Sequence, residues 1–182
     1  MESMEPEDTL FSFLDALGIK TQTLRHSPVF TVTEAQALRA ANGITMAGGH
    51  AKTLFLRDKK KRCALVVVDE NRQTDLKSLA PKIGLGRVSF GSLDNLQKLL
   101  GVTPGSVTPF ALVNAQTSED NTPPIAVALD KSLMVQTTLW FHPLHNAATT
   151  AIAANDLIVF IRACGYEPLL IDMDMPEANP QV

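Results

Sequence analysis

The chain of 182 residues is 45% hydrophobic and 19% charged, a composition typical of one compact domain with its own core. Its longest apolar runs are about five residues, too short to cross a bilayer, and four acids among the first eight residues are unlike a secretory signal. The two cysteines lie far apart and outside any CxxC pair, which argues against a disulfide or a thiolate metal site. We therefore expect a cytoplasmic protein that does not contact the membrane.

The formal net charge of −3 is unevenly distributed along the chain. Residues 50–100 hold eleven basic and five acidic residues, a net charge of +6, so the rest of the chain carries −9. A basic segment on an acidic protein can present a local patch to phosphates without binding every polyanion. The densest part of this segment consists of Lys59, Lys60, Lys61 and Arg62. This basic run either contacts nucleic acid or is a solvated turn.

The first part of the chain predicts two helices. Residues 9–17 place apolar side chains on one helical face, and Gly18 follows where such a helix would end. Thr33 and Gln36 form a capping-box pattern that opens a second helix. This second helix should end near residues 42–43, where Asn and Gly follow each other.

The middle of the chain changes from helical to strand-like periodicity. Residues 52–57 and 62–69 are short β-rich runs joined by a polar turn, and they predict a β-hairpin. A strand between two short helices is expected next, with the helices at 74–83 and 92–100 and the strand at 87–90.

The last third of the chain predicts further strands and one more helix. Three strands separated by turn-rich loops are expected at 110–114, 125–129 and 135–141. Asn155 is placed to cap an amphipathic helix that ends at Gly165, and a final strand follows at 168–172.

Hairpins mixed with helices, rather than strict alternation of strand and helix, predict the α+β class. We expect a mixed, mostly antiparallel twisted sheet with flanking helices. One domain should span residues 8–175, with flexible tails at 1–7 and 176–182.

No cofactor or metal is expected from the sequence motifs. The chain has no GxGxxG, P-loop, HExxH or GxSxG motif and no cluster of Cys and His. His142 and His145 have a spacing that could hold a metal on a helix, but Pro143 between them disfavours a helix there.

Three stretches are more specific than these patterns. Residues 48–56 place a lysine at the start of a strand after a glycine-rich turn, and 101–110 form a loop rich in glycine and proline. Residues 141–150 leave a strand through a Phe-His-Pro turn. In this order, and preceded by the His-Ser-Pro-Val-Phe-Thr segment at 26–31, they resemble the YbaK/ProX family. That family comprises the prolyl-tRNA synthetase editing domain and its free-standing relatives, and the resemblance covers about residues 10–172.

Within that family the sequence is most similar to the free-standing alanyl-tRNA(Pro) deacylases, called ProXp-ala or PrdX. The resemblance implies a twisted mixed sheet with flanking helices and metal-free hydrolysis of an aminoacyl-tRNA. The family's near-invariant lysine falls on Lys52, its GxxxP loop begins at Gly105, and its histidine falls on His142, so we predict these three as catalytic. The neighbours predicted to bind the substrate are Thr53, Ser106, Val107, Thr108, Pro109 and Asn146. Relatives often have Asn at the position of Thr53, and a hydroxyl cannot reproduce both ends of an amide.

These residue types suit ester hydrolysis, in which negative charge develops on the carbonyl oxygen and must be met by donors. Lys52 offers a point charge with three donors on a flexible stem. Gly105 permits close approach of a ligand, Pro109 fixes the exit dihedral of the loop, and His142 can orient the ribose or a water. The sequence suggests no nucleophile–base–acid triad, which favours substrate-assisted attack by water over a covalent intermediate.

The predicted substrate is mischarged tRNA(Pro), most readily Ala-tRNA(Pro). A synthetase site built for proline cannot strongly reject alanine, because a missing methylene is worth only about 1–3 kcal/mol, and a second pocket too small for proline can remove the error. We expect the basic run 59–62 to bind the tRNA. Transient contact with prolyl-tRNA synthetase or an elongation factor, and a homodimer, remain open. The alternatives are a deacylase for Ser or Cys, or a non-catalytic tRNA- or synthetase-binding module of the same fold.

Overall fold

The computed structural model describes residues 5–42, 46–115 and 125–174. In these residues the strands are β1 (Thr21–Arg25), β2 (Gly49–Asp58), β3 (Cys63–Asp69), β4 (Val88–Phe90), β5 (Ala126–Asp130), β6 (Thr138–Phe141), β7 (Ala148–Ala153) and β8 (Leu169–Ile171). The helices are α1 (Pro6–Ala16), α2 (Val32–Ala41), α3 (Leu76–Lys82), α4 (Leu93–Leu100), α5 (Lys131–Met134) and α6 (Ala154–Ala163), and Pro109–Ala115 forms a 3₁₀ helix, η1.

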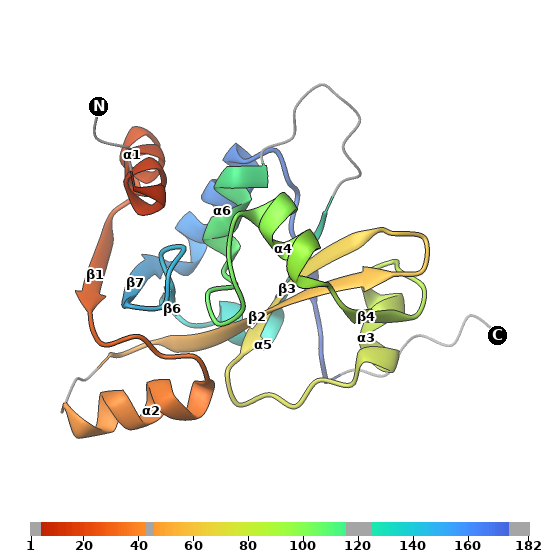
Figure 1. Ribbon diagram of the computed structural model, residues 1–182, viewed down its shortest axis with the longest axis horizontal. Helices are drawn as coiled ribbons and strands as arrows, with labels where there is room; N and C mark the ends of the chain where they lie inside the picture. The colour runs from red at the N-terminus through yellow and green to blue at the C-terminus, as the bar shows by residue number, and fades with distance from the viewer. Residues whose placement is uncertain (1–4, 43–45, 116–124, 175–182) are drawn as a thin grey trace.

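The strands form one mixed sheet in the order β1-β7-β6-β2-β3-β5-β8, and β4 pairs with β2 away from this path (Figure 1). Among the described strands, four pairings are antiparallel (β1–β7, β6–β7, β2–β3 and β2–β4). Three are parallel (β2–β6, β3–β5 and β5–β8). The predicted α+β class and mixed sheet with flanking helices are therefore confirmed, with a narrow antiparallel majority.

The central strand β3 shows how the core is divided between the two faces of the sheet. Its residues Cys63–Val68 are all buried, as expected of a strand covered on both faces. Because successive side chains point to opposite faces, Leu65 and Val67 pack with α1, α4, α6 and η1, whereas Ala64 and Val66 pack with α3. The sheet thus lies between two unequal apolar layers.

Two helix starts differ from the predicted ones. The cap of α2 is Thr31, whose Oγ1 accepts from the backbone N–H of Glu34 at 3.1 Å while the Glu34 carboxylate accepts from the N–H of Thr31 at 3.2 Å. The predicted Thr33 start was therefore two residues late, because this reciprocal pair lies earlier in the chain. Asn155 does not cap α6 either. That helix begins at Ala154, and its cap position makes no side-chain hydrogen bond.

The strand predicted at 110–114 is wrong, since these residues lie in η1. Phe110 is fully buried and makes edge-to-face contacts with Phe141 and Phe160, at centroid distances of 5.7 and 5.6 Å. A short apolar run of this kind does not distinguish a buried strand from a buried helix. The sequence patterns also missed β1, β7 and α5.

The N-terminal boundary differs from the expected one. Helix α1 begins at Pro6, so Pro6 and Glu7 belong to the helix and not to a tail over 1–7. Residues 1–4 of that tail and the expected tail at 176–182 lie outside the described residues. No helix in the described part of the chain is long and apolar enough to cross a membrane.

Candidate active site

A cavity of about 230 Å³ lies between α2, the first half of β2, the end of β6 and the loop before η1. Five of the residues predicted from the sequence line it, namely Lys52, Thr53, Gly105, Val107 and His142. Ser106 and Thr108 are buried in the loop, and Pro109 is buried at the start of η1, all three outside the cavity wall. Asn146 is half-buried in the turn after β6 and does not line the cavity either. The three residues predicted as catalytic therefore meet at one place.

Two glycines bring Lys52 to this cavity, because they let the start of β2 approach its neighbours closely. Gly48 has φ 117°, and a Cβ there would lie 2.3 Å from the carbonyl oxygen of Thr138. A Cβ on Gly49 would lie 2.8 Å from the side chains of Leu133 and Leu139. The parallel pairing of β2 with β6 at this point requires glycine, and it fixes the backbone from which the Lys52 side chain leaves.

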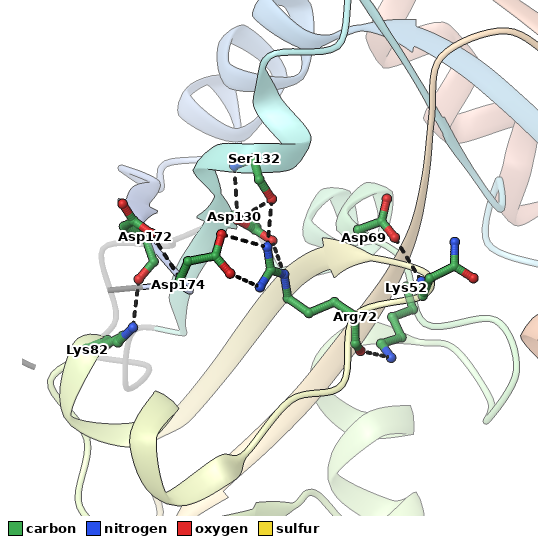
Figure 2. A network of polar contacts seen from close by, with 9 residues as sticks. Lys52, Asp69, Arg72, Lys82, Asp130, Ser132, Asp172 and Asp174 are labelled. Carbon is green, nitrogen blue, oxygen red and sulfur yellow. Dashed lines mark hydrogen bonds and ion pairs between the residues drawn. The ribbon is translucent and has the colours of Figure 1, made fainter. Parts of the chain in front are cut away.

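The Lys52 side chain is half-buried, and its ammonium donates a hydrogen bond to the backbone carbonyl of Arg72 (Figure 2). Arg72 follows β3, the antiparallel partner of β2, in which Val68 lies opposite Lys52. An ammonium has three donors, so two remain for a ligand when one is used by this carbonyl.

His142 follows β6, and its Nδ1 lies 2.8 Å from the carbonyl oxygen of Ala148. Because a carbonyl only accepts, Nδ1 carries the proton of the neutral ring and Nε2 is left as an acceptor. Burial lowers the pKa of His142, and the nearby His26 and His145 act in the same direction, although the hydrogen bond to Ala148 opposes them. The lowered pKa favours the neutral ring, in which Nε2 can accept a hydrogen bond.

The loop before η1 gives the cavity a wall of main chain. Gly105 has φ 85°, in the left-handed region, while a Cβ there would meet Phe30 at an ordinary 3.5 Å, so conformation rather than space calls for glycine. Ser106 N–H donates to the carbonyl of Thr103 at 3.0 Å and closes the turn. Gly105 and Val107, on either side of Ser106, both line the cavity, and within the described residues no backbone carbonyl accepts from their N–H groups. We expect these N–H groups to act as donors for a ligand oxygen.

Several residues of the cavity wall were not predicted from the sequence. Arg39 of α2 forms an ion pair with Glu70, Nη2 to Oε1 at 2.6 Å, with side chains 20% and 10% exposed. His50 and Trp140 stack with ring centroids 6.2 Å apart and planes at 6°. The charge of Arg39 and Glu70 was visible in the sequence, but their contact joins α2 to the segment after β3, which no local pattern indicates.

His145 does not line this cavity, and its ring contacts Glu7 of α1 instead. Its Nε2 is 2.6 Å from Oε2 of Glu7, and Oε1 of the same carboxylate lies 2.7 Å from Nη2 of Arg25, so the turn after β6 is tied to α1 and β1. Burial would raise the pKa of Glu7, but its hydrogen bonds with Arg25 and His145 lower it below the usual value. Among the described residues, no three His, Cys, Asp or Glu side chains cluster as they would around a metal ion.

The basic run lies at the other end of β2, in the turn to β3. Lys59 lies seven positions after Lys52, about 23 Å along an extended strand. Lys59 lines a second hollow of about 320 Å³ together with Arg57 and Arg87. Arg62 instead holds the turn, because its guanidinium lies 2.7 Å from the Asp58 carboxylate, whose side chain is only 2% exposed. The predicted tRNA-binding surface is thus distinct from the cavity.

Residues 26–160 match the family described as the aminoacyl-tRNA editing domain. The chain is 36% identical over 163 residues to the prolyl-tRNA editing protein ProX of Acetoanaerobium sticklandii, which covers 89% of this chain and 94% of that protein. It is 32% identical over 166 residues to prolyl-tRNA synthetase associated domain-containing protein 1 of Mus musculus, which covers 88% of this chain and 92% of that protein.

The fold also has counterparts among solved structures. A crystal structure presented as a candidate trans-editing enzyme for prolyl tRNA synthetase matches with a TM-score of 0.64 and 21% identity, over 93% of this chain and 99% of the other. That identity supports likeness of fold alone. The family match and the two relatives above 30% identity carry the assignment: this chain belongs to the aminoacyl-tRNA editing domain family.

Proposed function

We propose that the protein is a trans-editing deacylase that hydrolyses the ester bond of mischarged tRNA(Pro), with Ala-tRNA(Pro) as its main substrate. The observation that carries this proposal is that Lys52, His142 and the Gly105 loop line one small cavity. The names of the relatives from Acetoanaerobium sticklandii and Mus musculus both refer to prolyl-tRNA, which supports tRNA(Pro) as the carrier of the amino acid.

The cavity offers a complementary set of groups for attack by water on an ester. The Lys52 ammonium and the N–H groups of Gly105 and Val107 are donors for the carbonyl oxygen, on which negative charge develops. Neutral His142 has an acceptor at Nε2 for the attacking water or for a ribose hydroxyl of the terminal adenosine. The substrate's own hydroxyl can then help to move the proton, and no covalent intermediate is needed.

The small size of the cavity supports a preference for alanine. Its volume of about 230 Å³ must hold the amino acid together with the reacting part of the terminal nucleotide. Apolar walls from Val29, Val107 and Phe141 suit a methyl side chain. A proline ring is larger than a methyl group, so we expect the correctly charged product to fit less well, which is the logic of a second sieve.

A panel of aminoacyl-tRNAs tests the proposed function. The purified protein is incubated with labelled Ala-, Ser-, Cys- and Pro-tRNA(Pro) and with Ala-tRNA(Ala), and the release of the amino acid is followed. We expect hydrolysis of Ala-tRNA(Pro), with Pro-tRNA(Pro) spared. Faster release of serine or cysteine than of alanine would show that this amino acid, and not alanine, is the main substrate. Binding without any hydrolysis would favour the non-catalytic module.

Replacing Lys59, Lys60 and Lys61 together by glutamine is expected to weaken tRNA binding and reduce its salt dependence. Each lost phosphate contact should lower the slope of log K against log salt by about 0.7–0.9. Arg62 is left in place because it neutralises the buried Asp58. The affinity is measured as a function of salt by fluorescence anisotropy.

The control for this prediction is Lys20→Gln, which removes an exposed charge outside the basic segment. The hydrolysis rate at saturating protein should stay unchanged in both variants, because the turn is remote from the cavity. An unchanged salt slope in the triple variant would restore the interpretation of these lysines as a solvated turn.

A further inference from the structure

Arg72 links the candidate site to a polar network on the far side of the segment that follows β3. Its backbone carbonyl accepts the hydrogen bond from the Lys52 ammonium, while its side chain extends the other way, towards the ends of β5 and β8 (Figure 2). One residue therefore connects the lysine of the cavity to elements that do not line the cavity.

The guanidinium of Arg72 has three partners. Its Nε lies 2.7 Å from Oδ2 of Asp130, in an ion pair whose geometry is not that of an aligned hydrogen bond. Its Nη1 lies 2.7 Å from Oδ1 of Asp174, and its Nη2 donates to Oγ of Ser132 at 3.0 Å. The hydrogen bond to Asp174, and after it the charge of Asp130, raise the pKa of Arg72, although burial opposes them. The side chain is held as a charged fork between β5 and the residues after β8.

Asp130 is the fixed point of this network. Its side chain is 1% exposed, and its Oδ1 accepts from the backbone N–H and the hydroxyl of Ser132 at 3.0 and 2.9 Å. A buried carboxylate held by a helix start can shift little, so the guanidinium paired with it is held as well.

The segment that carries the Arg72 carbonyl is also tied at its other end. The N–H of Glu70 donates to the carbonyl of His50 at 2.9 Å, and the Glu70 carboxylate pairs with Arg39. The N–H of Arg72 donates to the carbonyl of Asp69 at 3.1 Å, which closes a turn between these anchors. The carbonyl that receives Lys52 thus has a defined place.

We propose that Arg72 is a positioning residue, whose anchored carbonyl holds the Lys52 ammonium where it meets the ester, and this inference rests on the proposed function. A lysine side chain has four rotatable bonds and loses much conformational freedom when it is ordered. The Arg72 carbonyl provides that order before the substrate arrives and leaves two ammonium donors for it. The guanidinium network acts on the reaction only through Lys52.

The test is a double-mutant cycle of Arg72→Lys and Lys52→Ala, followed as single-turnover hydrolysis of Ala-tRNA(Pro). A lysine at 72 keeps a cation beside Asp130 but cannot reach Asp130, Asp174 and Ser132 at once. We expect Arg72→Lys to slow hydrolysis about 10- to 100-fold at unchanged tRNA affinity, the usual effect of misplacing a reacting group by about 1 Å. In the Lys52→Ala background the same change should have no further effect.

A second readout does not depend on activity. The rate of reductive methylation of the Lys52 ammonium, followed by mass spectrometry of the folded protein, should rise in Arg72→Lys and less so in Asp174→Asn. The control is Arg162→Lys, which alters an ion pair with Glu167 whose side chains are 58% and 68% exposed, and which should change neither readout.

Each outcome decides the proposal. Equal slowing by Arg72→Lys in both backgrounds would show that Arg72 acts on the fold as a whole and would overturn it, as would an unchanged hydrolysis rate in the wild-type background. If the wild-type protein hydrolyses none of the aminoacyl-tRNAs, the proposed function fails, and the methylation rates then decide by themselves whether Arg72 orders Lys52.

Discussion

Replacing Lys52 with alanine is expected to lower the single-turnover rate of Ala-tRNA(Pro) hydrolysis by the equivalent of about 2–4 kcal/mol, the scale of one lost electrostatic donor. The reason is positional. The glycine pair before Lys52 fixes its backbone against β6, and the Arg72 carbonyl holds its ammonium beside the cavity. The loss should appear in the rate at saturating enzyme, because the charge acts most strongly as the ester oxygen becomes negative.

Stability should change far less than activity in the same variant. Lys52 is half-buried and donates one hydrogen bond to the Arg72 carbonyl, so its removal should cost about 1 kcal/mol of folding free energy. Thermal melts followed by circular dichroism measure this change. Lys52→Arg should restore little activity, because a planar fork does not occupy the place of a compact ammonium.

The matched control for Lys52 is Lys131→Ala, which removes an exposed lysine from α5. Its rate should equal that of the wild-type protein. Wild-type hydrolysis by Lys52→Ala would remove the centre of the proposed site, and it would favour the non-catalytic binding module.

The features that could be predicted from the sequence are those with local causes. The hairpin of β2 and β3 follows from two β-rich runs around a polar turn, and the glycine pair before Lys52 marks a close approach of the backbone. The family resemblance supplied Gly105 and His142, whose place beside Lys52 depends on the pairing of β2 with β6. That pairing joins segments about ninety residues apart and has no local signature.

The features that could not be predicted depend on contacts between distant segments. Strands β1 and β7 pair with each other, and their short polar and small-residue sequences become strands through this pairing. The η1 segment has an apolar run that suits a strand equally well. It forms a 3₁₀ helix that packs Phe110 against Phe141 and Phe160, which are distant in the sequence. The hydrogen bond from Lys52 to the Arg72 carbonyl could not be predicted, because every residue has a backbone carbonyl and the residue types do not indicate which one accepts.

Replacing His142 with asparagine is expected to slow hydrolysis and to remove the acid limb of its pH dependence. An asparagine amide can still donate to the Ala148 carbonyl, but it has no group that titrates in this range and lacks the ring acceptor at Nε2. In the wild-type protein, burial holds the pKa of His142 below its ordinary value of 6.5, and the nearby His26 and His145 add to this effect. The neutral ring should therefore stay available at pH values somewhat below 6.5.

The sign of the effect follows from which form accepts a hydrogen bond. As the pH falls through the lowered pKa, His142 takes up a proton at Nε2 and can no longer receive a hydrogen bond from water or ribose. The rate of the wild-type protein should fall there, and its stability should fall as well. In the unfolded chain this histidine binds its proton near pH 6.5, at a higher pH than in the folded protein. Lowering the pH from 6.5 to the pKa of the folded protein therefore stabilises the unfolded state relative to the folded one.

The measurement is the single-turnover rate from about pH 5 to 8, the range in which histidine titrates, after subtraction of spontaneous ester hydrolysis. The control is His145→Ala, which loses the contact with Glu7 outside the cavity. That variant should melt at a lower temperature, because the tie between α1 and the turn after β6 is lost. It should keep an acid limb, displaced to higher pH because His145 no longer helps to lower the pKa of His142. An acid limb that persists in His142→Asn would assign the titration to another group. A limb lost in His145→Ala alone would show that the functional histidine is His145, three residues further along the chain.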